Sequence, residues 1–213
     1  MKLVGSTSNA EATVTNIRLI GDDIGNVYGS FFVRNPLTSP APPLRFTNGT
    51  KTLRKLVSKM YSSHLSHDNV LITSGSAEAN FLSVMTQLDK GDEIIYMVPN
   101  YLQIRHLAKS FGIIVKDLPL RHSLGWQWGL DELKSLISPK TKMIVICNPN
   151  NPTGAIMSDS VMDGVIKIAK DYDCWILSDE VYGGSELDGL ESRSFAGSTA
   201  KTSVTRGWSK ADM

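Results

Sequence analysis

Short apolar runs alternate with segments of helical periodicity along most of this 213-residue chain, and this alternation restricts its fold more than any other feature. The runs are rich in Val, Ile and Leu, as in strands that are buried on both faces. The segments between them repeat apolar residues three and four positions apart, which predicts helices with one buried side. The predicted strands are residues 70–73, 94–98, 113–115, 143–147, 174–177 and 202–205, and the predicted helices are residues 53–61, 76–88, 101–111, 130–137 and 158–172.

This order of elements predicts a doubly wound α/β domain with a mainly parallel sheet. Parallel neighbours need a crossover connection, and right-handed crossovers place helices on both faces of the sheet. Ser158, directly before the last predicted helix, is a suitable N-cap. Ligands of such sheets bind at the carboxyl ends of the strands, so the residues that follow each strand are the candidates for a functional site.

The first 45 residues lack this pattern. Four prolines, at positions 36, 40, 42 and 43, make an extended stretch without helix, because proline fixes its own backbone and restricts the residue before it. We therefore expect residues 1–45 to form an arm or linker and residues 46–213 to form the domain.

Composition excludes several classes of protein. Lys and Arg number 22 and Asp and Glu 21, a net charge of +1, so we expect no nucleic acid and no membrane as partner. No apolar stretch is long enough to span a bilayer, and no secretory leader is recognisable. Cys147 and Cys174 each lie in an apolar run, which predicts buried free thiols and a cytoplasmic protein. The four histidines fall on different elements, so we expect no metal site.

Five polar motifs follow predicted strands or lie just beyond them, at positions that a parallel sheet brings to one edge. A seven-residue stretch such as NPNNPTG is more specific than a turn requires. The motifs are SGSA at 74–77, PNY at 99–101, NPNNPTG at 148–154, SDEVY at 178–182 and GWSK at 207–210.

Each motif also has a purely structural explanation. Gly and Ser are ordinary turn residues, Tyr101 is compatible with a core aromatic, and a lone lysine such as Lys210 is usually solvated. Asp179 is compatible with a helix cap. However, a carboxylate at the end of a buried apolar strand needs a cationic or hydrogen-bonding partner, which favours a functional site.

In this order and spacing the motifs resemble those of the class I and II aminotransferases, enzymes of fold type I that use pyridoxal 5′-phosphate (PLP). Residues 49–54, GTKTLR, also match the family's G-x-x-x-L-R helix start. The resemblance covers about residues 46–213. It implies the large domain of a PLP-dependent transferase that moves an amino group between an amino acid and a 2-oxo acid.

The resemblance also implies a role for individual residues. Lys210 matches the lysine that holds PLP as an internal aldimine and then moves the proton as general base and acid. Asp179 matches the aspartate beside the pyridine nitrogen, which keeps that nitrogen protonated. Asn151 and Tyr182 match the donors to the cofactor's phenolic oxygen, and Tyr101 matches the aromatic side chain that stacks on the ring.

The phosphate of PLP has its own matching segment. Gly75, Ser76 and Ala77 match the family's phosphate-binding backbone amides at a helix N-terminus. Ser209, beside the lysine, is a weaker candidate for the same group.

The chain ends three residues after Lys210. The family continues with a phosphate-binding arginine and with a small C-terminal domain that binds the substrate carboxylate. We therefore expect an incomplete large domain, a fragment that is weakly active or inactive alone. By the same resemblance, the full-length protein is expected to be a homodimer with sites between its subunits.

Two other functions remain open at this point. A PLP-dependent lyase or cyclase that acts on an amino acid would use the same scaffold, because PLP stabilises the carbanion and the pocket decides its fate. The second alternative is a non-catalytic, truncated fragment that only binds PLP.

Overall fold

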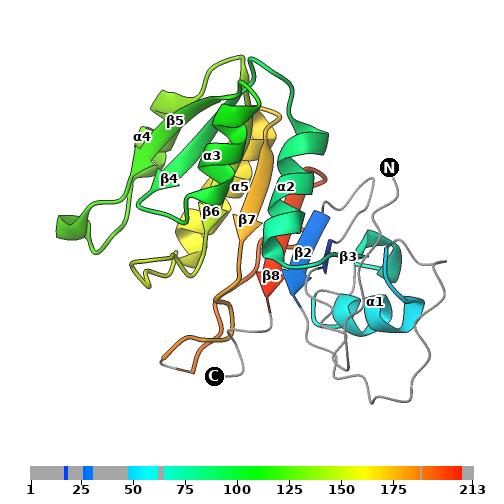
Figure 1. Cartoon of the computed structure of the whole chain (residues 1–213). Coiled ribbons are helices and arrows are strands. Elements are labelled where there is room, and N and C mark those ends of the chain that lie inside the picture. Colours follow the sequence, from blue (N-terminus) through cyan, green and yellow to red (C-terminus); the bar gives the residue numbers. More distant parts are fainter. Residues whose placement is uncertain (1–16, 19–25, 31–47, 62–64, 188, 208–213) are drawn as a thin grey trace.

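The computed structural model describes residues 17–18, 26–30, 48–61, 65–187 and 189–207. Its centre is a six-stranded sheet with the strand order β2-β8-β7-β6-β4-β5, in which every neighbouring pair is parallel (Figure 1). The predicted parallel α/β sheet is therefore confirmed. The strands are Asn26–Ser30 (β2), Glu93–Val98 (β4), Ile114–Pro119 (β5), Thr141–Cys147 (β6), Trp175–Asp179 (β7) and Thr202–Gly207 (β8).

Helices cover both faces of this sheet, as the doubly wound prediction requires. Alternate residues of a strand face opposite sides, and β4 shows the consequence. Ile94 and Tyr96 pack in a cluster with residues of helices α2 and α3, whereas Ile95 and Met97 pack in another with residues of α4 and α5. Figure 1 shows α2 and α3 in front of the sheet. The helices are Lys51–Ser58 (α1), Ser76–Gln87 (α2), Gln103–Ser110 (α3), Leu130–Leu136 (α4) and Asp159–Asp171 (α5).

Two helices begin at capping residues that the sequence supplies. The Ser158 hydroxyl accepts a hydrogen bond from the backbone N–H of Val161 at the start of α5, which confirms the predicted N-cap. Thr50 does the same for α1 by accepting from the N–H of Leu53. Short 3₁₀ turns at His67–Asn69 and His122–Leu124 complete the helical segments.

The prediction for residues 70–73 was wrong in one respect. A strand is present, Leu71–Ile72 (β3), but it pairs antiparallel with Ile17–Arg18 (β1) in a separate two-stranded sheet. Both β3 residues are only half-buried. A short run of Leu and Ile suits any half-buried strand, and its pattern does not specify a partner.

Strand β2 had no counterpart among the predicted elements. It lies within the first 45 residues, in the stretch NVYGS, and pairs with β8 at the edge of the six-stranded sheet. The proline-rich segment of the predicted arm lies outside the described residues.

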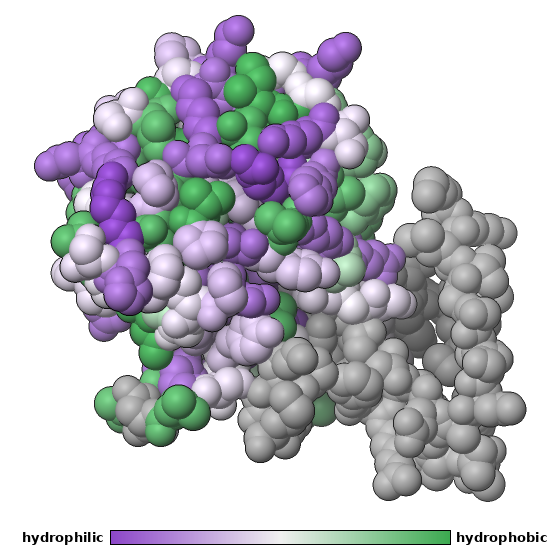
Figure 2. Space-filling model, turned by 60° about the vertical axis from the view of Figure 1, so that its left-hand side comes forward, coloured by the Kyte–Doolittle hydropathy of each residue, from purple (hydrophilic) through white to green (hydrophobic). Residues whose placement is uncertain are grey.

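The thiols of Cys147 and Cys174 are free and buried, as predicted. On the face shown in Figure 2, hydrophobic side chains are interspersed with hydrophilic ones. Within the described part of the chain, every helix is too short or too polar to cross a bilayer.

Candidate active site

Four neighbouring strands end at the same edge of the sheet. Strands β4, β6, β7 and β8 end at Val98, Cys147, Asp179 and Gly207. The backbone N–H of Asn148 donates to the carbonyl of Asp179 across 3.0 Å, so the segment 148–154 starts directly beside the end of β7. Three of the predicted motifs, at 99–101, 148–154 and 178–182, therefore follow neighbouring strand ends. Ser209 and Lys210, which follow β8, lie outside the described residues.

Asp179 is a buried carboxyl group at the end of β7, with 7% of the residue exposed. Its Oδ1 accepts a hydrogen bond from the N–H of Val181 (3.2 Å), and the side chain of Asn80 on α2 faces it. Burial raises the pKa of Asp179 to about 6, and these two donors oppose the rise. A carboxylate in this setting suits a cationic or protonated partner that arrives with a ligand.

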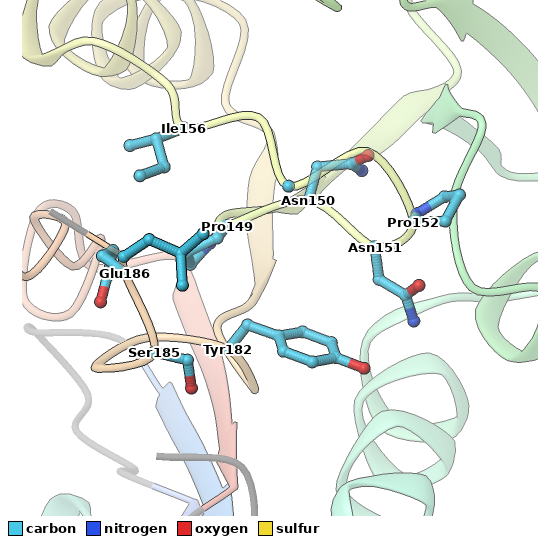
Figure 3. A pocket seen from close by; sticks show the side chains of 10 residues that line it. Pro149, Asn150, Asn151, Pro152, Ile156, Tyr182, Ser185 and Glu186 are labelled. Atoms are coloured by element: carbon cyan, nitrogen blue, oxygen red, sulfur yellow. The ribbon is translucent and has the colours of Figure 1, made fainter. Parts of the chain in front are cut away.

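The two middle asparagines of NPNNPTG have different surroundings. Asn150 is 4% exposed, and its side chain holds the loop together. Its amide donates to the carbonyl of Pro99 (3.3 Å), and its Oδ1 accepts from the hydroxyl of Thr153 (2.7 Å). The side chain of Asn151 makes no hydrogen bond to another described residue and points into a pocket (Figure 3). Asn151 is therefore the asparagine that is available to a ligand.

This pocket has a volume of about 490 Å³ and lies between the segment 149–156 and the segment that follows β7. Figure 3 shows that the amide of Asn151 and the phenol of Tyr182 point toward the same end of it. Two hydrogen-bond donors that converge in this way suit a negatively charged oxygen on a ligand.

Helix α2 begins at the predicted anion-binding segment. Gly75 is the N-cap and has a φ of 90°, a left-handed conformation that favours glycine. Within the described part of the chain, the N–H groups of Ser76 and Ala77 have no hydrogen-bond acceptor. The first N–H groups of a helix have no partner inside the helix, so they can bind an anion.

Tyr101 lies just beyond the end of β4, and 55% of the residue is exposed. Its carbonyl accepts a hydrogen bond from the buried hydroxyl of Tyr96, which fixes the backbone at this point. The exposure excludes the alternative that Tyr101 is a core aromatic. Its ring is free to pack against a ligand.

Comparison with known proteins now decides the family. The family model of the class I and II aminotransferases matches residues 46–211. The chain belongs to this family. Among curated aminotransferases, it is 34% identical over 139 residues to the probable aspartate aminotransferase of Methanocaldococcus jannaschii, a match that covers 63% of this chain and 36% of the relative. It is 37% identical to the aspartate aminotransferase of Pyrococcus horikoshii, over 58% of this chain and 32% of the relative.

Solved aminotransferases share the fold. A PLP-dependent aminotransferase from Streptococcus suis matches with a TM-score of 0.74 and 32% identity, over 80% of this chain and 45% of that protein. The alanine aminotransferase of Pyrococcus furiosus matches with a TM-score of 0.61 and 30% identity, over 64% of this chain and 36% of that protein. The chain spans about a third of the length of the curated aminotransferases it matches.

Two residues at this candidate site were missed by sequence reasoning. Asn80 lies about a hundred positions before Asp179, so no local pattern connects them. Glu180 was noticed only as part of SDEVY, but it is buried and bonded to two segments. No local signal singled out Asn80, because α2 contains several polar residues and Ser83 is buried on the same helix.

Proposed function

We propose that this chain forms the cofactor-binding part of a PLP-dependent enzyme that transfers an amino group between an amino acid and a 2-oxo acid. The observation that carries the proposal is the buried carboxyl of Asp179 at the end of β7. Hydrogen-bond donors that suit a phosphate and a phenolic oxygen lie at the same edge of the sheet. Membership of the aminotransferase family supports the same conclusion.

The described residues fit PLP group by group. PLP carries a basic ring nitrogen, a phenolic oxygen and a phosphate. Asp179 is an ionisable acceptor for the nitrogen, and Asn151 and Tyr182 are donors for the oxygen. The N–H groups of Ser76 and Ala77, at the start of α2, are not bonded to any described residue and suit the phosphate.

When bound, PLP supplies an electron-deficient ring that withdraws electrons from the α-carbon of the substrate. Asp179 holds the proton on the ring nitrogen and so maintains that deficiency. Tyr101 covers one face of the ring. In this proposal Lys210 anchors the cofactor and moves a proton at the α-carbon of the substrate, with Ser209 as a further phosphate donor.

Several finer points belong to the same proposal. Residues 46–213 form the PLP-binding unit, and β2 from the preceding segment adds an edge strand to its sheet. The full-length enzyme is a homodimer, as the family resemblance implies. Two buried free thiols support a cytoplasmic location. L-Aspartate is the first substrate to test, because curated relatives are named for it.

Attachment of PLP is the direct test. The chain is incubated with PLP, reduced with borohydride, digested and analysed by mass spectrometry. We expect the adduct on the peptide that contains Lys210, and its loss in Lys210→Ala. Lys201→Ala is the matched control, because Lys201 lies just before β8 and is occupied by an ion pair with Asp173 at 2.6 Å. An adduct spread over many lysines, or one lost equally in the control, contradicts the proposal.

A further inference from the structure

Asn80 lies at the centre of a buried hydrogen-bond network that touches several parts of the candidate site. It is 1% exposed, on the side of α2 that faces the sheet. Its Oδ1 accepts a hydrogen bond from the hydroxyl of Thr205 (2.9 Å), and its Nδ2 donates to Oε1 of Gln103 (3.3 Å). The carboxyl of Asp179 faces the same side chain.

The donors and acceptors in this network set the orientation of the Asn80 amide. A primary amide has one acceptor oxygen and two N–H hydrogens. The oxygen is occupied by Thr205 and one hydrogen by Gln103, which leaves the second hydrogen for the neighbouring carboxyl of Asp179, whose pKa the Asn80 amide lowers. Thr205 and Asp179 are register partners in β8 and β7, which places both within reach of a single side chain.

The network also reaches the start of α2. Nε2 of Gln103 donates to the carbonyl of Ala77 across 2.8 Å. One connected set of hydrogen bonds therefore joins β8, the start of α3 and the first turn of α2, and it lies beside the carboxyl of Asp179 because Thr205 is the register partner of Asp179. A hydrophobic residue at position 80 would fill the same volume, so packing alone does not require an amide here.

We propose that Asn80 is a positioning residue that orients the Asp179 carboxyl and keeps it ionised toward the pyridine nitrogen of PLP. The part that concerns PLP rests on the proposed function, whereas the effect of Asn80 on Asp179 is a property of the chain itself. Asn80 acts through Asp179 and needs no contact with substrate.

Other ionisable groups near Asp179 do not account for this effect. Tyr96 and Cys147 would repel the Asp179 carboxylate only in their ionised forms. Burial raises the pKa of the Tyr96 phenol and of the Cys147 thiol far above neutrality, so both groups are uncharged where Asp179 titrates. Asn80 is therefore the side chain whose replacement should move the pKa of Asp179.

The first experiment measures that pKa without any cofactor. The chain is labelled with ¹³C at the aspartate carboxyl groups, and the Asp179 signal is assigned by its loss in Asp179→Asn. We expect Asn80→Leu, which keeps the branched shape of the side chain and removes the donor, to raise the Asp179 pKa by about one unit. Two variants of Thr205 test the orientation of the Asn80 amide. Thr205→Val should raise the Asp179 pKa by a smaller amount, and Thr205→Ser should leave that pKa unchanged because the hydroxyl is retained.

The outcomes separate this inference from the proposed function. An unchanged Asp179 pKa in folded Asn80→Leu overturns the inference. If Asn80→Leu does not fold by circular dichroism, equal values in Thr205→Val and Thr205→Ser overturn it instead. A second measurement adds PLP and follows its absorbance with pH, where Asn80→Leu should shift the profile and weaken binding about 3- to 10-fold. If the parent chain does not bind PLP, the proposed function fails while the NMR result still decides the role of Asn80.

Discussion

The carboxyl groups of Asp179 and Glu180 contact different parts of the fold, although the two residues are adjacent in the chain. Asp179 faces Asn80 on α2, whereas Oε1 of Glu180 accepts hydrogen bonds from the Ser178 hydroxyl and from the N–H of Phe195, each at 2.9 Å. Glu180 thus ties the segment that follows β7 back onto the strand. Only Asp179 remains available to a ligand at the strand ends.

Glu180→Gln should flatten the dependence of stability on pH. Burial raises the pKa of Glu180 to about 7, while a glutamate in the unfolded chain titrates near ~4.3. Between these two pKa values Glu180 is protonated in the folded chain and ionised in the unfolded chain. The free energy of unfolding is therefore highest below about pH 4.3 and falls as the pH rises through this window to about 7. The loss is on the order of 3 kcal/mol for this group.

Urea denaturation at about pH 4.5 and about pH 7.5 measures the effect. The variant should show a smaller difference between the two values than the parent chain. Glu132→Gln serves as control, because hydrogen bonding to Arg121 lowers the pKa of that carboxyl and moves its titration below the window. Equal pH slopes in the parent chain and Glu180→Gln would refute the assignment.

Asn150→Ala and Asn151→Ala should separate folding from ligand binding. Asn150 has a buried side chain that bonds Pro99 and Thr153, so its loss should cost about 2 kcal/mol of unfolding free energy. Asn151 points into the pocket, and its replacement should change stability by less than about 0.5 kcal/mol while weakening PLP binding. Chemical denaturation and PLP titration of both variants provide the comparison. A larger loss of stability in Asn151→Ala, with weaker PLP binding in Asn150→Ala, would contradict these assignments.

The sequence predicted the motifs at the strand ends, but not the buried hydrogen bonds that position their side chains. The ends of β4, β6 and β7 meet at one edge because parallel strands in register must do so, and the motifs that follow them therefore gather without long-range information. Asn80 and Thr205 lie 125 positions apart, and their contact depends on how α2 packs on the sheet. No local spacing encodes such a pair.

The same limit explains the missed strand pairings. Strand β2 has the sequence NVYGS, which lacks the continuous apolar run of a buried strand, and it forms through pairing with β8. Strand β3 has the expected composition but finds its partner in β1. Composition predicts that a segment is extended, whereas the partner is chosen by tertiary contacts.

Cys147 and Cys174 should be inert in the folded chain. Burial raises the pKa of both thiols, so the reactive thiolate is scarce and enclosed. A thiol reagent at about pH 8 should label neither cysteine in native buffer and both in denaturant. Rapid labelling of either one before unfolding would show that its segment opens locally.

Ser158→Ala should destabilise the chain by about 1 kcal/mol through loss of the N-cap of α5. Thermal or urea unfolding measures the change. Ser160→Ala is the matched control: Ser160 lies in the first turn of the same helix and its hydroxyl contacts only that of Ser158 among the described residues, so its replacement should stay within about 0.5 kcal/mol. Similar losses in both variants would assign the effect to helix propensity.

The pairing of β2 with β8 has a consequence for the order in which the molecule is assembled on the ribosome. Residues 26–30 are synthesised before the other strands of the six-stranded sheet, but their neighbour in it is residues 202–207. The earliest strand of this sheet must therefore wait until nearly all of the described chain has been synthesised, and it docks last. Completion of the sheet is in this sense a closure between two segments that lie far apart in the polypeptide.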